Sequence, residues 1–95
     1  MLIARKRHTV GDRRKYIVDY SQWLAAGEEL NPFLGFSATT TSTTASVDFI
    51  SCNPTYLQFF VNGGVLNEIF TVSIQVTTLT GEVKNDTVEF FVVAP

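Results

Sequence analysis

The sequence predicts an all-β protein, an immunoglobulin-like antiparallel β-sandwich of about six to seven short strands. Three observations predict it. Apolar and polar residues alternate with period two in the last third of the chain, turn residues recur about every eight to twelve positions, and the only helical candidate is a single turn. A small closed β-barrel is the alternative architecture.

The clearest strand runs from Phe70 to Thr78, where apolar side chains alternate with hydroxyl and amide side chains. A second alternating run, with Val88 and Phe90 on one face, follows Gly81. Residues that face each other across two paired strands lie on the same face of the sheet. The apolar residues of both runs have even numbers, so the two residue numbers of each facing pair must add up to an even number. The sequence therefore predicts a hairpin with an odd-length loop of three residues, centred on Thr80 or Gly81.

Two further strands are expected upstream, from Val47 to Cys52 and from Tyr56 to Val61. The dipeptide Asn53-Pro54 separates them, because proline lacks a backbone N–H and favours a turn. Leu57, Phe59 and Val61 point to the same side of the second strand. Asn62-Gly63-Gly64 then ends it, since glycine admits the positive φ of a turn.

Near the start of the chain, residues 16–20 read as a strand, and residues 21–27 form at most one helical turn. Residues 28–46 predict one strand and a long loop. Trp23 is expected to plug one end of the core beside Tyr20 and Leu24, with a sugar-stacking platform as the alternative.

The basic residues are concentrated at the start of the chain. Six of the seven lie in the first fifteen positions, where Asp12 is the one acid, whereas eight acids and one Lys follow. We therefore divide the chain into a basic N-terminal arm, residues 1–15, and a sandwich domain, residues 16–95. The arm is expected to pivot at Gly11 and to order on an acidic neighbouring subunit, with simple disorder as the alternative. Nucleic acid is disfavoured as a partner because no aromatic residues interleave the basic ones.

The candidate protein-interface residues are of two kinds. The first are basic residues of the arm, and the second are large apolar residues on the outer faces of strands, where a contact with another chain would explain them. They are Arg5, Lys6, Arg7, Arg13, Arg14, Phe60 and Phe91.

We expect no enzymatic activity, cofactor or metal. His8 is the only histidine and is assigned to the arm, away from the core, so no nucleophile–base pair with Cys52 is expected. Cys52 reads as a buried apolar residue and, as the only cysteine, forms no intrachain disulfide. The acids are scattered rather than gathered in a calcium loop. Neither a secretory segment nor a membrane span is expected, and the single cysteine fits folding in a reducing cytoplasm.

Two stretches of the chain resemble a known family. The first is Asp12-Arg13-Arg14-Lys15-Tyr16-Ile17-Val18-Asp19-Tyr20-Ser21-Gln22-Trp23-Leu24, and the second is Asp86-Thr87-Val88-Glu89-Phe90-Phe91-Val92-Val93. Both are similar to segments of small Ig-like virion structural proteins of tailed bacteriophages, of the fiber-tail adaptor and neck or tail decoration type. The resemblance spans nearly the whole chain and departs from the family's pattern at Asn31-Pro32-Phe33-Leu34-Gly35.

The resemblance implies a structural subunit present in multiple copies around a symmetric tail or neck, made in the bacterial host cytoplasm and located in the virion. Its partners would be tail, neck or fiber subunits, with no membrane contact. The sequence thus predicts an adaptor that links tail or neck proteins to fibers or to neighbouring subunits. The alternative is a host-surface glycan-binding module of a virion that uses Trp23 or Tyr56.

Overall fold

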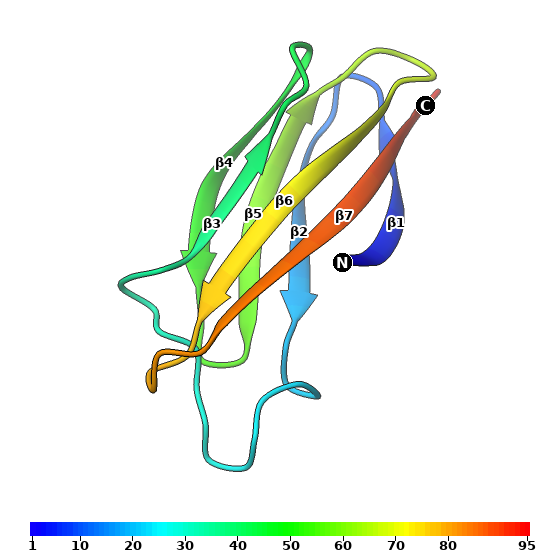
Figure 1. The fold of residues 1–95 in the computed structure, drawn as a ribbon. Helices are drawn as coiled ribbons and strands as arrows, with labels where there is room; N and C mark the ends of the chain where they lie inside the picture. Colours follow the sequence, from blue (N-terminus) through cyan, green and yellow to red (C-terminus); the bar gives the residue numbers. More distant parts are fainter.

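The computed structural model describes residues 1–95 as seven strands and no helix, so no helix could cross a membrane. The strands form two sheets that pack face to face (Figure 1), with the orders β1-β7-β6-β3 and β2-β5-β4. Every pairing is antiparallel except β1 with β7, which is parallel. The strands are β1 (Leu2–Thr9), β2 (Arg13–Asp19), β3 (Ser37–Thr40), β4 (Ala45–Cys52), β5 (Tyr56–Gly63), β6 (Ile69–Thr77) and β7 (Val83–Val93).

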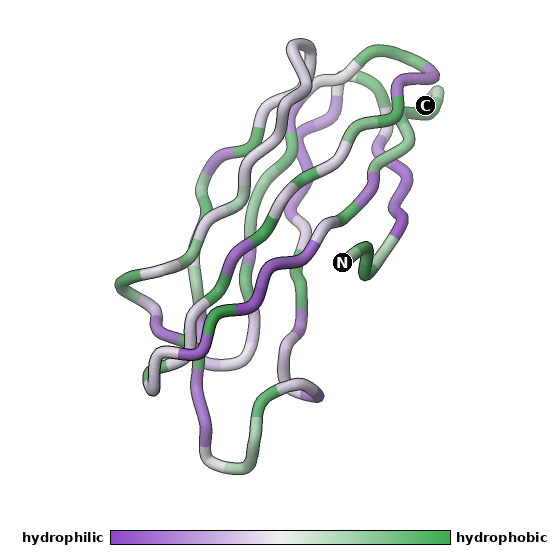
Figure 2. The backbone as a smooth tube through the Cα atoms, viewed as in Figure 1, coloured by the Kyte–Doolittle hydropathy of each residue, from purple (hydrophilic) through white to green (hydrophobic).

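Alternating residues from both sheets form the core between the layers. Hydrophobic and hydrophilic positions alternate along the backbone of β6 (Figure 2). Phe90 of β7 is fully buried, and its ring meets the rings of Tyr16 and Phe59 from the opposite sheet at centroid distances of 4.8 and 6.4 Å. Each large apolar side chain buried in this way stabilises the fold by roughly 1.5–3 kcal/mol. The apolar positions expected on β5, β6 and β7 are confirmed as core: Leu57, Phe59, Val61, Phe70, Val72, Ile74, Val76, Val88, Phe90 and Val92.

The β6–β7 hairpin has the predicted register. Phe70 faces Phe90, and every other pair has the same sum of residue numbers. The Thr78 N–H donates to the Glu82 carbonyl at 2.8 Å, which leaves the three residues 79–81 as the loop, centred on Thr80. Gly81 has a φ of +97°, a value that L-residues with side chains rarely adopt. The odd loop length predicted from the alternation is confirmed.

The turn at Asn53-Pro54 and the break at Gly63-Gly64 also lie where the sequence predicted them. Residues 28–46 contain the short strand β3 and much of the long connection that precedes it, as expected, and β4 begins at Ala45. Leu30 is fully buried and bridges to Thr78, so part of this connection belongs to the core. Cys52 is buried at the end of β4.

The N-terminal residues differ from the expected arm. The free arm over residues 1–15 is not confirmed, because residues 2–9 form β1 and residues 13–15 begin β2. β1 completes one sheet by pairing with the outer edge of β7, from Leu2 opposite Thr87 to Thr9 opposite Val93. The inward positions of β1 carry few apolar residues, so this strand depends on backbone hydrogen bonds to β7. For the same reason, its sequence shows no alternation of apolar and polar residues.

His8 was expected in the arm, away from the core, and this expectation is wrong. Its side chain is fully buried on the inner side of β1. Its Nε2 lies 3.1 Å from the Asp12 carbonyl, which only accepts, so Nε2 carries the hydrogen. Its Nδ1 lies 2.9 Å from the Tyr16 hydroxyl, which can then donate to it. His8 therefore connects β1 of one sheet to β2 of the other.

We predict that deletion of residues 2–9 destabilises the whole fold, because it uncovers the β7 edge and removes the His8–Tyr16 hydrogen bond. The free energy of unfolding, measured by urea denaturation with circular dichroism, should fall by at least about 3 kcal/mol. The control Lys6→Gln with Arg7→Gln, which removes two of the three basic side chains lost in the deletion, should change it by less than about 0.5 kcal/mol. An unchanged midpoint for the deletion would mean that β1 behaves as an independent arm.

Candidate functional site

The candidate interface residues fall on two opposite outer faces. Arg13 and Phe60 lie on the outer face of β2-β5-β4, and Arg5, Arg7 and Phe91 lie on the outer face of the other sheet. The remaining two, Lys6 and Arg14, share the inward parity of His8 and Tyr16 but stay exposed. The structure therefore separates the expected site into two surfaces.

A β-bulge in β4 shapes the first surface. Asp48 faces Phe60 and Ser51 faces Gln58, so Phe49 and Ile50 together occupy the place of one residue. Because of this extra residue, Asp48 and Phe49 are both exposed while Ile50 packs against the core. The bulge therefore turns a large aromatic side chain outward next to a carboxylate.

Phe49 has a left-handed backbone. Its φ is +47°, a region that costs an L-residue other than glycine about 1–2 kcal/mol. Its side chain is 72% exposed, so little burial offsets that cost. A strained and exposed phenylalanine is informative, because sparsely populated backbone conformations concentrate at functional sites.

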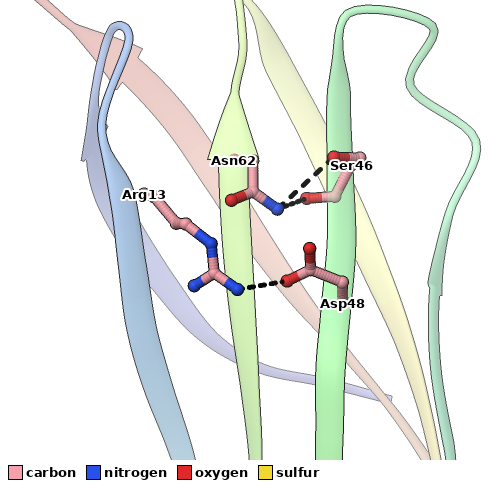
Figure 3. Close-up of polar contacts among 4 residues, drawn as sticks. All are labelled: Arg13, Ser46, Asp48 and Asn62. Atoms are coloured by element: carbon pink, nitrogen blue, oxygen red, sulfur yellow. Dashed lines mark hydrogen bonds and ion pairs between the residues drawn. The ribbon is translucent and has the colours of Figure 1, made fainter.

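Arg13 contacts both the exposed ring of Phe49 and the half-buried ring of Phe60. Its guanidinium carbon lies 4.2 Å from the ring centroid of Phe60 and 5.0 Å from that of Phe49. The two rings meet edge to face with their centroids 6.1 Å apart. Arg13 Nη2 also lies 3.1 Å from Asp48 Oδ1 (Figure 3), so the guanidinium has fixed contacts on several sides. We call these four residues the aromatic–arginine cluster.

The cluster has polar neighbours on the same face. The Asn62 side-chain amide lies 3.4 Å from both the backbone carbonyl and the hydroxyl of Ser46 (Figure 3). The Arg13–Asp48 pair is itself about half exposed, and such surface pairs contribute roughly 0–1 kcal/mol. The ion pair therefore contributes little to folding stability. Exposed aromatic residues beside an arginine have the composition of protein interfaces.

The second surface is a row across three strands. Arg7 of β1 and Ile69 of β6 both face Phe91 of β7, whose side chain is 40% exposed. In the next row, Arg5 Nε lies 3.2 Å from Glu89 Oε1. This face also combines apolar and basic side chains, but none of the residues named on it has a positive φ.

Sequence reasoning missed Phe49 and Asp48 as interface candidates. One signal was available, since the adjacent apolar residues Phe49 and Ile50 interrupt the period-two pattern of the β4 run. Trp23 is also placed differently from the expected plug. It is 37% exposed, and the buried aromatic residue at this end is Tyr20, whose ring it contacts.

The reactive side chains outside these faces are in structural environments. Both ring nitrogens of His8 have partners, and burial raises the pKa of the Cys52 thiol, which lowers its thiolate fraction at neutral pH. No group of three or more His, Cys, Asp or Glu side chains lies together in a geometry that could hold a metal ion.

Aromatic and arginine side chains are enriched in protein–protein interfaces, so the composition of these surfaces indicates a protein-binding module. Residues 8–91 match the model of the family described as podophage GP4 fiber-tail adaptor protein gp77. The chain belongs to this family, as the resemblance of its two end segments led us to expect. Membership identifies a phage fiber-tail adaptor, which implies a virion location and contacts with other phage tail or fiber proteins. No curated protein matches the sequence.

We predict that Phe49→Asn lowers the free energy of unfolding of the isolated protein by no more than about 1 kcal/mol. Asparagine tolerates the left-handed conformation, and this relief offsets the lost ring contacts. Urea denaturation measures the effect. The core control Phe59→Ala should lose about 3–5 kcal/mol. A similar loss at position 49 would instead make this ring part of the folding core.

Proposed function

We propose that the protein is a non-enzymatic connector that docks to a tail or fiber subunit through the aromatic–arginine cluster. The observation that most supports this proposal is the conformation of Phe49, which a bulge holds at positive φ and leaves mostly exposed. Docking would bury its ring and desolvate Arg13, and buried aromatic and arginine side chains contribute most of the binding energy in many interfaces.

We further propose that several copies form a symmetric ring. The two candidate surfaces lie on opposite outer faces, so one subunit can contact two different neighbours at once. A heterologous contact between copies closes into a ring when the rotation between subunits permits it. In this arrangement the Phe91 row contacts a neighbouring copy of the protein, and the aromatic–arginine cluster stays available for the tail or fiber subunit.

The proposal includes an immunoglobulin-like classification of the fold. In that fold, strands B, E and D share one sheet and strands C, F and G share the other. The orders β2-β5-β4 and β3-β6-β7 have the same pattern, with β1 as the first strand beside the last. We also propose synthesis in the host cytoplasm, in keeping with a single buried free thiol.

We also propose that the protein catalyses no reaction. The environments of its two most reactive side chains support this. His8 has a partner at each ring nitrogen, and Cys52 is buried with a raised pKa. Neither side chain is poised to act as a nucleophile or a general base toward a substrate in solution.

The docking role is tested by assembling tails with the double variant Arg13→Ser, Phe49→Ser in place of the parent. We expect fiber occupancy, counted by quantitative mass spectrometry of purified particles, to fall at least about tenfold, which is the loss of one strong interface residue. Leu79→Ser, at an exposed apolar position in the β6–β7 turn, is the matched control and should assemble normally. Equal occupancy for both proteins would rule out this face.

A second candidate function, glycan binding, is favoured by the exposure of Trp23 beside a groove. A sugar that stacks on its indole should shift the tryptophan emission, which reports this residue alone because it is the only Trp in the chain. Emission that stays constant across bacterial surface oligosaccharides would eliminate this function.

A further inference from the structure

A groove opens between the edge strands of the two sheets. β1 and β2 diverge from the turn at Gly11 (Figure 1), and the His8–Tyr16 hydrogen bond spans them near that turn. Toward the other end lies a cavity of about 320 Å³, whose lining is mostly apolar. Ile3 and Ala4 of β1, Val18 of β2 and Trp23 are among its lining residues.

The backbone of β1 is unpaired on the groove side. Val10 N–H donates to the Val93 carbonyl, and groups along a strand point alternately to its two sides. Lys6 and His8 therefore direct their backbone groups toward β7, whereas Arg5 and Arg7 direct theirs to the free edge. The Tyr16 hydroxyl lies 3.4 Å from the Arg7 carbonyl, which agrees with this orientation.

β2 has a free edge as well. Tyr20 N–H donates to the Thr55 carbonyl, so the even-numbered residues of β2 bond to β5. The odd-numbered residues, which include Ile17 and Asp19, direct their backbone groups away from β5. Both sides of the groove thus carry unpaired strand edges, which readily accept another strand.

Charge around the groove is unevenly distributed. β1 and β2 carry six of the seven basic residues of the protein: Arg5, Lys6, Arg7, Arg13, Arg14 and Lys15. The seventh, Lys84, lines the groove together with Lys6. Only Arg5 and Arg13 among the six form ion pairs with acids of the same chain. The edge therefore favours an acidic partner.

The groove also has a buried hydrogen-bond acceptor. Asp86 is almost fully buried; its Oδ2 accepts from the Tyr20 hydroxyl at 2.9 Å, and burial followed by this bond raises the pKa of Tyr20. Its Oδ1 lies 3.3 Å from Lys84 Nζ, at ion-pair distance. The carboxylate of Asp86 is therefore paired within the chain, and its negative charge is offset by a neighbouring cation.

We propose that this groove takes an extended segment of a neighbouring tail or fiber subunit, in which apolar and acidic residues alternate. The segment adds as a strand to the free edge of β1, with its apolar side chains against Val18 and Trp23. Its acidic side chains meet the basic residues of β1 and β2. Backbone pairing supplies affinity and the alternating side chains supply specificity in this mode.

The inference rests on the proposed connector function and adds the recognition mode of one partner. Hydrogen–deuterium exchange on the free protein and on purified assembled tails tests it. The peptide spanning residues 2–9 should gain protection on assembly, because the free amides of Arg5 and Arg7 become paired. The loop of residues 79–81 should remain unprotected. Unchanged exchange in residues 2–9 would overturn the proposal, whichever other surface is covered.

A variant pair separates backbone pairing from charge. Arg5→Pro removes an N–H that the alternation along β1 directs away from β7, at a position where edge strands tolerate proline. Arg5→Gln removes the charge and keeps the N–H. Circular dichroism should show both variants folded. We expect Arg5→Pro to lower incorporation into tails at least tenfold and Arg5→Gln to lower it less than threefold. Equal incorporation of the two variants would overturn strand addition.

A photo-crosslinker at Ile3 identifies the occupant. Crosslinks to an alternating apolar and acidic segment of another virion protein support the proposal, and crosslinks to a second copy of this chain or to glycan overturn it. If the parent chain does not join tails at all, the connector function fails together with this inference. If the parent chain joins tails but its groove stays unoccupied, the connector function stands and only this inference fails.

Discussion

The parallel pairing of β1 with β7 is the interaction on which the rest of the structure depends. It carries the chain from one sheet to the other through the turn at Gly11, so β2 begins on the opposite layer. It brings His8 into the interior and into contact with Tyr16. It also sets two basic strands along one side of the protein. The groove and the position of Arg13 both follow from this one pairing.

The sequence allowed prediction of those parts of the fold in which burial imposes a period of two. In β5 up to Val61, in β6, and in β7 from Val88 onward, each inward position is apolar, so both the strands and the hairpin register could be read directly. β1 was not predicted as a strand because its inward positions are Ala4, Lys6 and His8, a set that resembles a solvated tail. Its partner strand lies about 80 residues away, and hydrogen bonding between distant backbones leaves no pattern in the side chains.

The candidate site was predicted in part, for a related reason. Phe60 and Arg13 stood out as an exposed apolar residue and a clustered charge, and the structure brings them together. Phe49 was hidden because a bulge shifts the alternation by one residue, and a shift of this kind depends on strand register. Local sequence can indicate which side chains are unusual for a surface, but it cannot show which of them share one.

The exposed edges of β1 and β2 also bear on how copies of the protein behave before assembly. Two uncapped strand edges on a small β protein invite self-pairing into aggregates. Here the same edges carry a high density of lysine and arginine, so like charges repel when two copies approach edge to edge. The basic residues therefore oppose edge-to-edge pairing of two copies.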